Sequence, residues 1–185
     1  MEPTIQRIVS ANDIPSLHQI LIACGLDLKE RFDLSHWMPG VYSLESMLKD
    51  AMSLEVYALT IGEAQVGTFM LETTSSVPLS YIKYGSIRWQ VKDASAVYVH
   101  KLAVLPAWQG QGLGTWCLRT IERLAGQRDC NTVRLDAVKT HPRLLSFYAS
   151  QGYQQVGELI YNSDLWVDAF VFEKVLMPDG FEILV

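Results

Sequence analysis

Cysteine is scarce in this chain, which has three cysteines, Cys24, Cys117 and Cys130, among 185 residues. Their odd number excludes complete pairing, and no two share the Cys-x-x-Cys spacing of a thiolate zinc site. The four histidines are scattered without carboxylates at ligand spacing, so they predict no metal site either. We therefore expect a protein of the reducing cytoplasm that holds no metal.

Positive charge is also in short supply. The chain has 15 Lys and Arg against 20 Asp and Glu, a net charge of −5, and a pI near 5.3. Because nucleic-acid affinity comes from a surplus of basic residues over one face, we expect no nucleic-acid partner. The longest uncharged stretch, Leu102 to Leu118, is interrupted by Pro106 and polar residues, and the first residues lack the pattern of a signal peptide. We expect a cytoplasmic protein with no membrane partner.

Internal repeats, low-complexity tracts and Pro/Ser-rich linkers are absent as well. Hydrophobic residues make up 49% of the chain, and its 12 glycines and 7 prolines are dispersed. A chain of this length and composition can bury a sizeable core. The sequence therefore predicts one domain that covers residues 1–185.

The first half of the chain carries strand and helix patterns. Thr4 to Val9 alternates like a strand, and an apolar stripe from Ile14 to Cys24 predicts a helix that ends at Gly25. A short helix is expected over 44–52, followed by strands over 55–61 and 65–73 with a turn at Gly62-Glu63. The longer connection over 74–95 contains many aromatic and apolar residues, so we expect it to pack as an extra hairpin or lid.

The second half predicts a mixed α/β order. Strands are expected over 96–105, 132–138, 153–160 and 165–174, and helices over 113–126 and 142–150. The second of these helices has Pro142 near its start and Gly152 just past its end. A strand, crossover helix and strand imply a locally parallel pairing.

A glycine-rich turn, Gln109-Gly110-Gln111-Gly112-Leu113-Gly114, lies between an apolar strand and an amphipathic helix. Glycines let the backbone approach an anion, and the free N–H groups at a helix start favour a phosphate. The Walker A motif is excluded because no Lys-Ser/Thr follows the last glycine, and the dinucleotide fingerprint is poorly matched because Thr115 replaces its third glycine. Taken alone, the turn could equally be a structural loop without a ligand.

The residues around this turn resemble the GCN5-related N-acetyltransferase (GNAT) family. Leu102 to Trp108, followed by Gln109-x-x-Gly112-x-Gly114, is similar to the family's acetyl-CoA motif after its fourth strand. Downstream, Leu135 to Val138 and then Phe147-Tyr148-Ala149-Ser150-Gln151-Gly152-Tyr153 resemble its fifth strand and its Tyr-x-x-x-Gly-aromatic signature. The chain departs from the family pattern at His141 and Leu144, where the family often has Asn and Ala.

The resemblance implies an α/β (α+β) fold, with a mostly antiparallel, splayed central sheet flanked by helices. It also implies transfer of an acetyl group from acetyl-CoA to a primary amine by direct attack in a ternary complex, with acetyl-CoA as cosubstrate and no metal. The cofactor-binding residues it implies are Leu102, Ala103, Val104, Gln109, Gly110, Gln111, Gly112, Leu113, Gly114, Thr115, His141 and Tyr148. The alternative is a non-catalytic acyl-CoA sensor of the same fold.

Two proton transfers need catalytic groups. By the resemblance, Tyr148 is the general acid for the departing thiolate, although a core tyrosine bonded to backbone is the other interpretation. His100 lies two residues before Leu102, hence on the same strand face, and is our candidate base; Asp136, Glu72 and Glu55 are alternatives. Cys117 falls on the helix stripe, so no nucleophile for a ping-pong route is evident.

The acceptor is expected to be a small-molecule or peptide amine. Trp37, Tyr42 and Trp89 occupy the two segments where the family places its acceptor walls, or else they are ordinary anchoring aromatics. The apolar tail, Phe181 to Val185, suggests a possible homodimer.

Overall fold

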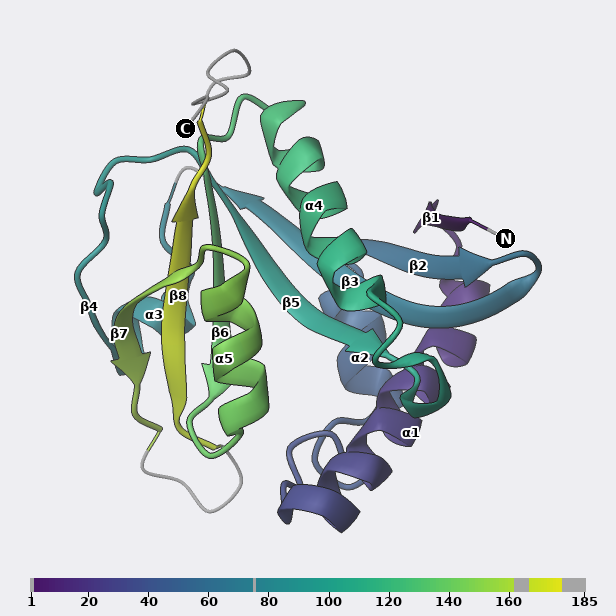
Figure 1. Ribbon diagram of the computed structural model, residues 1–185. Helices are drawn as coiled ribbons and strands as arrows, with labels where there is room; N and C mark the ends of the chain where they lie inside the picture. Colours follow the sequence, from purple (N-terminus) through teal and green to yellow (C-terminus); the bar gives the residue numbers. More distant parts are fainter. Residues whose placement is uncertain (1, 75, 162–166, 178–185) are drawn as a thin grey trace. The chain divides into compact units, whose positions relative to one another are not determined.

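A computed structural model of the chain describes residues 2–74, 76–161 and 167–177, and these residues form two compact units (Figure 1). The described part of the first unit comprises residues 2–72 and 99–116, and that of the second comprises residues 73–98, 117–161 and 167–177, apart from residue 75. Strand β5 (Ala96–Val104) and helix α4 (Leu113–Gly126) contribute residues to both units. The prediction of a single domain over 1–185 stays a prediction.

The first unit is built on an antiparallel meander. Strands β1 (Pro3–Ile8), β2 (Glu55–Ile61) and β3 (Ala64–Thr74) lie in the order β1-β2-β3-β5, and β1–β2 and β2–β3 are antiparallel. Gly62 turns the chain between β2 and β3 with φ 59°, a conformation that glycine adopts without strain. The strands predicted over 4–9, 55–61 and 65–73 are thus confirmed.

Helix α1 (Ile14–Phe32) corrects the prediction that a helix ends at Gly25. The helix continues through Gly25 and ends at Asp33, whose left-handed backbone (φ 57°) closes the last turn. The glycine serves packing instead, because a Cβ there would lie 2.5 Å from the carbonyl oxygen of Trp37. The short 3₁₀ turn η1 (Ala11–Asp13) leads into α1, and helix α2 (Leu44–Asp50) confirms the helix predicted over 44–52.

The core of the first unit lies between these two helices and the strands. Apolar residues of α1 and α2 are buried against β2, β3 and the end of β5. The fully buried members include Leu17, Leu21, Met47, Ala58 and Met70. This packing fixes the end of β5, from which the glycine-rich turn begins.

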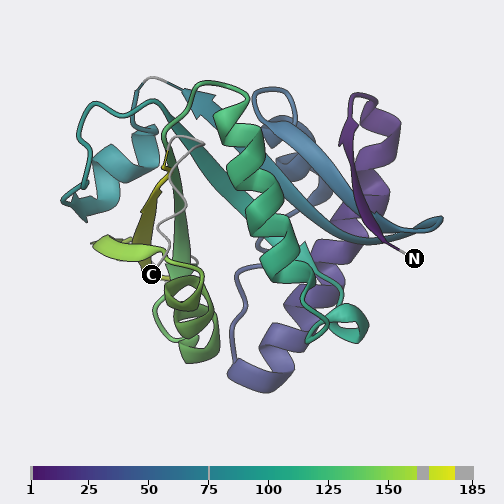
Figure 2. The ribbon, with the colours of Figure 1, turned by 45° about the horizontal axis from the view of Figure 1, so that its top comes forward.

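The strands of the second unit lie in the order β5-β6-β8-β7-β4. Its strands are β6 (Thr132–Val138), β8 (Ala169–Val175), β7 (Gln154–Leu159) and β4 (Gly85–Ile87), and the β6–β8, β8–β7 and β7–β4 pairs are antiparallel. Helix α5 (Pro142–Ser150) covers one face of this ladder, and helix α3 (Leu79–Tyr84) lies on the other (Figures 1 and 2).

Several predictions for the second unit hold, and two need correction. The helices over 113–126 and 142–150 and the strand over 132–138 have the predicted bounds. However, the strands that α5 connects do not pair, because β8 lies between β6 and β7, whereas β5 and β6, which α4 connects, are neighbours in the sheet. The segment over 74–95 forms α3 and β4 instead of a hairpin, and β4 pairs with β7.

The last predicted strand begins later than expected. It was placed over 165–174, whereas β8 starts at Ala169; residues 165 and 166, like the apolar tail from Phe181 to Val185, lie outside the described residues. The fold class is confirmed as a mixed α/β arrangement with a mostly antiparallel sheet and flanking helices. The splay implied for its central strands stays a prediction.

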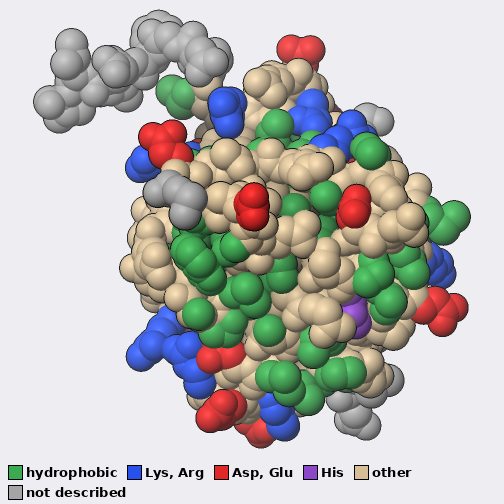
Figure 3. Space-filling view, turned by 90° about the vertical axis from the view of Figure 1, so that its right-hand side faces the viewer, with side chains coloured by type: hydrophobic (Ala, Val, Ile, Leu, Met, Phe, Trp, Pro, Cys, Tyr) green, Lys and Arg blue, Asp and Glu red, His purple; other side chains and the backbone are tan. Residues whose placement is uncertain are grey.

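No described helix has the length and apolar character needed to cross a bilayer. On the face drawn in Figure 3, hydrophobic side chains gather in the middle, and small groups of basic and acidic side chains lie mostly around them.

Candidate active site

The glycine-rich turn follows β5 and the short 3₁₀ turn η2 (Pro106–Trp108), and it leads directly into α4. Gly110 and Gly112 have φ angles of 75° and 81°, in the region that favours glycine. The N–H of Trp116 donates to the carbonyl of Gly112 at 3.0 Å, which starts the helical pattern. The N–H groups of residues 113–115 therefore have no acceptor within the helix, and such groups at the positive end of a helix favour an anion.

Two glutamine side chains hold this turn against the preceding chain. The Gln109 amide donates to the carbonyl of Val104 at 2.9 Å, and the Gln111 amide donates to that of Ala107 at 3.2 Å. The space beside the glycines is open, because a Cβ added at Gly110 or Gly112 would meet no atom within 4 Å. The backbone of the turn, supported by its side chains, thus offers room for a phosphate group.

Strand β5 is irregular just before the turn. Lys101 has φ 53°, an uncommon conformation for a non-glycine residue within a strand. The prediction that His100 and Leu102 share a strand face assumed an extended backbone, and the left-handed residue between them invalidates that argument. The carbonyl of Val104, one of the groups expected to pair with pantetheine, already accepts the Gln109 amide and the Cys24 thiol, the latter at 3.3 Å.

His100 forms a polar pair with a carboxylate of the neighbouring strand. Its Nε2 lies 3.1 Å from Oε2 of Glu72 on β3, and the two side chains are 19% and 29% exposed. The pair is therefore sheltered but within reach of solvent. A carboxylate in this position orients the imidazole, so two of the candidate bases act as one pair.

Tyr148 lies on α5, packed against Phe147, Tyr153 and Phe172 with ring centroids 5.4–6.0 Å away. Burial, and then the negative charge of Asp136, raise the pKa of Tyr148 well above the usual value of a phenol. The two interpretations of Tyr148, as the general acid and as a core tyrosine, both stay predictions.

His141 occupies the N-cap position of α5. Its Nδ1 accepts the N–H of Leu144 at 3.3 Å, which satisfies one of the unpaired donors at the helix start. The imidazole of His141 therefore caps the helix, at a position where a short polar side chain is more usual. Its predicted contact with the cosubstrate stays a prediction.

Burial explains why the cysteines of this region are poor nucleophiles. It raises the pKa of the Cys24 thiol and of the Cys117 thiol to about 12 in each case, with the charge of Asp27 as a second cause for Cys24. Both thiols are protonated at neutral pH, and the thiolate is the reactive form. Within the described parts of the chain, no cluster of three or more His, Cys, Asp or Glu side chains is arranged to hold a metal ion.

Comparison with known proteins agrees with this geometry. The sequence profile of the acetyltransferase (GNAT) family matches residues 37–153, which is more than half of the chain. The chain belongs to the GNAT family. The matched segment contains β5, the glycine-rich turn, α4 and α5.

Individual relatives are distant. The uncharacterized N-acetyltransferase YesJ of Bacillus subtilis (strain 168) is 37% identical over 62 residues, and this match spans 34% of each protein. Among solved structures, GNAT acetyltransferases of Streptococcus agalactiae and Listeria monocytogenes are 13% and 17% identical, with TM-scores of 0.72 and 0.70. Both comparisons cover 95% of this chain and 96% of the other.

A third GNAT structure, from Elizabethkingia anophelis, was solved with acetyl-CoA bound. It is 16% identical, has a TM-score of 0.63, and the comparison covers 94% of this chain and 98% of that one. At such identities the agreement concerns the GNAT fold.

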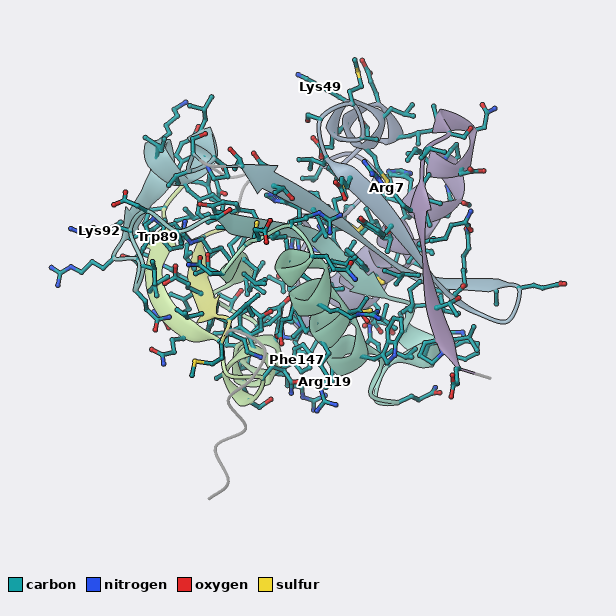
Figure 4. All side chains as sticks on the ribbon, turned by 90° about the horizontal axis from the view of Figure 1, so that it is seen from above. Arg7, Lys49, Trp89, Lys92, Arg119 and Phe147 are labelled. Atoms are coloured by element: carbon teal, nitrogen blue, oxygen red, sulfur yellow. The ribbon has the colours of Figure 1, made fainter. Side chains whose placement is uncertain are left out.

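The aromatic residues expected to line the acceptor site are engaged within their own units. Tyr42 is buried, its hydroxyl donates to Asp50 at 2.7 Å, and the ammonium of Lys101 lies 4.7 Å from its ring centroid. Trp37 packs at the edge of the same core. In the second unit, the Cζ atom of Arg134 lies 3.9 Å from the ring centroid of Trp89. In Figure 4, Lys92 extends outward, and Trp89 lies closer to the strands.

Sequence reasoning missed two polar pairs in the second unit of this GNAT protein. The buried Arg134 pairs with the buried Glu173 at 2.9 Å, and the Tyr81 hydroxyl donates to Asp136 at 2.7 Å. A signal for both exists, because Arg134 and Asp136 interrupt the apolar run of β6 at alternate positions and hence lie on one strand face.

Proposed function

We propose that this protein transfers an acetyl group from acetyl-CoA to a primary amine, which attacks the thioester directly in a ternary complex. The observation that carries the proposal is the turn from Gln109 to Gly114, whose glycines and free helix-start N–H groups suit a pyrophosphate. Membership of the GNAT family supports the same assignment.

Binding is assigned mainly to backbone groups. The N–H groups from Gln111 to Thr115 hold the pyrophosphate, where the helix dipole adds about 0.3–2 kcal/mol for an anion. The backbone over 102–104 pairs with pantetheine, and an N–H near Leu102 polarises the thioester carbonyl as an oxyanion donor. Because the Val104 carbonyl already has two donors, the N–H groups and the other carbonyls of this stretch supply the pairing.

The first proton to move is that of the acceptor. An alkylammonium of pKa near 10.4 loses its proton at a free-energy cost of roughly 4 kcal/mol near neutral pH. The His100–Glu72 pair takes this proton, directly or through water, and the carboxylate orients the imidazole. The free amine nitrogen then bonds to the thioester carbonyl carbon.

The second proton goes to the leaving group. As the carbon–sulfur bond breaks, the electron pair stays on sulfur, and the Tyr148 O–H donates its proton to that thiolate. The raised pKa of Tyr148 keeps its hydroxyl protonated until then, and solvent returns the proton afterwards. The acylated nitrogen releases its second proton to solvent, and the products are an N-acetylated amine and free CoA. With both thiols protonated, Cys24 and Cys117 supply no acyl-enzyme route.

The test is calorimetric titration of acetyl-CoA into the wild type and three glycine variants. We expect Gly112→Glu to abolish binding, since its carboxylate meets the pyrophosphate. Gly112→Ala controls for the backbone strain at φ 81°, worth roughly 1–2 kcal/mol. Gly126→Glu places the same charge in open space at the other end of α4, and we expect it to bind normally. No binding to the wild type, or normal binding to Gly112→Glu, would refute the proposal.

A further inference from the structure

Lys101 is unusual among the described residues because it combines a long side chain with a left-handed backbone. The other two non-glycine residues with positive φ, Asp33 and Asp129, follow helices α1 and α4, and a short polar side chain tolerates this conformation. Lys101 instead lies inside β5, with φ 53°. Such a conformation is unfavourable for lysine and persists only where neighbouring groups hold it.

The chain on both sides of Lys101 is tied to strand β3 of the same unit. Before it, His100 pairs with Glu72. After it, the N–H of Leu105 donates to the carbonyl of Val66 at 2.8 Å. These two hydrogen bonds fix the ends of the segment, but neither of them involves Lys101 itself. The conformation of Lys101 therefore needs a further contact.

The side chain of Lys101 supplies that contact. Its ammonium lies 4.7 Å from the ring centroid of Tyr42, and both residues belong to the first unit. Ring faces attract cations, the more so where water is partly excluded. Among the described residues, no carboxylate forms an ion pair with Lys101. The ring of Tyr42 is therefore what restrains the ammonium.

Tyr42 is held in place by both helices of the first unit. The residue is buried, its hydroxyl donates to Asp50 of α2 at 2.7 Å, and its carbonyl accepts Nε2 of His18 in α1 at 3.0 Å. Burial, and then the hydrogen bond and charge of Asp50, raise the pKa of the Tyr42 phenol. The ring that faces the ammonium is therefore neutral, and the contact is a cation–π interaction with a fixed partner.

We propose that Tyr42 is a positioning residue, which holds Lys101 in its left-handed conformation and thereby orients the N–H of Leu102. A left-handed residue within a strand interrupts the regular ladder and re-aims the groups that follow it. The inference rests on the proposed acetyl transfer, in which an N–H near Leu102 polarises the thioester carbonyl. If Lys101 relaxed to an extended conformation, that N–H would turn away and stabilise the developing oxyanion less.

The first arm of the test changes the side chain of Lys101. Lys101→Met keeps the length of the side chain but removes the ammonium, whereas Lys101→Gly removes the strain, because glycine adopts positive φ freely. Acetyl transfer is followed with n-butylamine and the dipeptide Ala-Ala as acceptors. We expect kcat to fall about 3–30-fold in Lys101→Met, the factor that one cation–ring contact supplies. Lys101→Gly should have a kcat at least about threefold higher than that of Lys101→Met.

The second arm changes the ring. Tyr42→Leu should lower kcat as Lys101→Met does, and Lys101→Gly added to Tyr42→Leu should restore most of the loss. The affinity for acetyl-CoA, measured by calorimetry, should change less than about threefold, because the glycine-rich turn is intact. The matched control is Lys83→Met, which removes an ammonium lying 4.8 Å from the ring centroid of Tyr84 on helix α3 and should leave kcat unchanged.

A spectroscopic measurement tests the contact without turnover. The three-bond coupling between HN and Hα of residue 101, measured by NMR, reports its φ angle. In Tyr42→Leu and in Lys101→Met this coupling should shift toward that of an extended strand, and in Lys83→Met it should stay that of the wild type.

Three results would overturn the inference. Residue 101 could keep its positive φ in both Tyr42→Leu and Lys101→Met. Lys101→Gly could lose as much kcat as Lys101→Met, which is expected if the ammonium itself contacts the substrate. Lys101→Gly could fail to restore Tyr42→Leu, which is expected if Tyr42 is a wall of the acceptor site. Failure of the proposed function looks different: the wild type neither binds acetyl-CoA nor forms product, while the coupling still depends on Tyr42.

Discussion

Replacing Glu173 by glutamine should destabilise the fold strongly. The side chain of Glu173 is fully buried and that of Arg134 is 2% exposed, with Nη2 and Nε of the arginine each 2.9 Å from Oε1 of the glutamate. The remaining guanidinium donors reach the hydroxyl of Tyr98 at 2.8 Å and the carbonyl of Val91 at 2.7 Å. Glu173→Gln keeps the volume but leaves a buried positive charge without its counter-charge.

The size of the effect follows from this burial. Breaking a buried ion pair by removing one partner typically costs about 3–5 kcal/mol. The amide also loses an acceptor that receives the N–H of Gln90 at 2.6 Å. For a chain of 185 residues, each kcal/mol shifts Tm by about 2–4 °C, so we expect a drop of roughly 6–20 °C. Glu158→Gln, which removes a partly exposed partner of Lys139, should cost under about 1 kcal/mol.

Urea unfolding followed by circular dichroism measures the free energy of unfolding of both variants. A double variant, Arg134→Met with Glu173→Leu, removes both charges and should recover most of the lost stability, because no unpaired charge remains buried. A Glu173→Gln loss no larger than that of Glu158→Gln would refute the reasoning, and so would a double variant less stable than Glu173→Gln alone.

Two further predictions concern ionisation. Tyr148→Phe should lower turnover by about 10²–10⁴-fold, as expected of a general acid, while its affinity for acetyl-CoA stays near that of the wild type. Steady-state kinetics measures the turnover and calorimetry measures the affinity. Unchanged turnover would show that Tyr148 only packs in the core. Burial raises the pKa of the Cys24 and Cys117 thiols from 9.0 to about 12, so the folded state holds protons that the unfolded state releases. Stability should thus be full below pH 9 and fall between pH 9 and 12, by about 1.4 kcal/mol per pH unit for each thiol. Unfolding free energies at pH 8–10.5 should fall less steeply in Cys117→Ala, and an unchanged slope would contradict the assignment.

The parts of the fold that the sequence predicts well are those with local causes. Helix α4 begins after the glycines of the turn, and α5 lies between Pro142 and Gly152, so both ends of each helix are encoded within a few residues. The conformation of the glycine-rich turn is predictable for the same reason. Its conformation depends on glycines at positive φ and on the helix that follows, and both are visible in the sequence.

The errors have non-local causes. Gly25 stands inside α1 because the backbone at Trp37 passes within contact distance, which no helix-ending rule detects. Strand β4 lies close against β7 because Gly157 has no Cβ; an added one would be 2.3 Å from the carbonyl oxygen of Ser86. Each glycine is visible in the sequence, but the sequence does not show which other segment packs against it.

The partners of the charged residues on β6 were missed for a related reason. Arg134 and Asp136 share a face of β6, and the simplest expectation would pair them with each other. Side chains two apart on a strand run alongside one another about 7 Å apart, whereas directly opposed residues of adjacent strands approach to about 5 Å. The register of β6 and β8 sets Arg134 opposite Glu173 and Asp136 opposite Val171. Insertion of β8 between β6 and β7 therefore gives the arginine its carboxylate, whereas Asp136 forms no ion pair with another described residue.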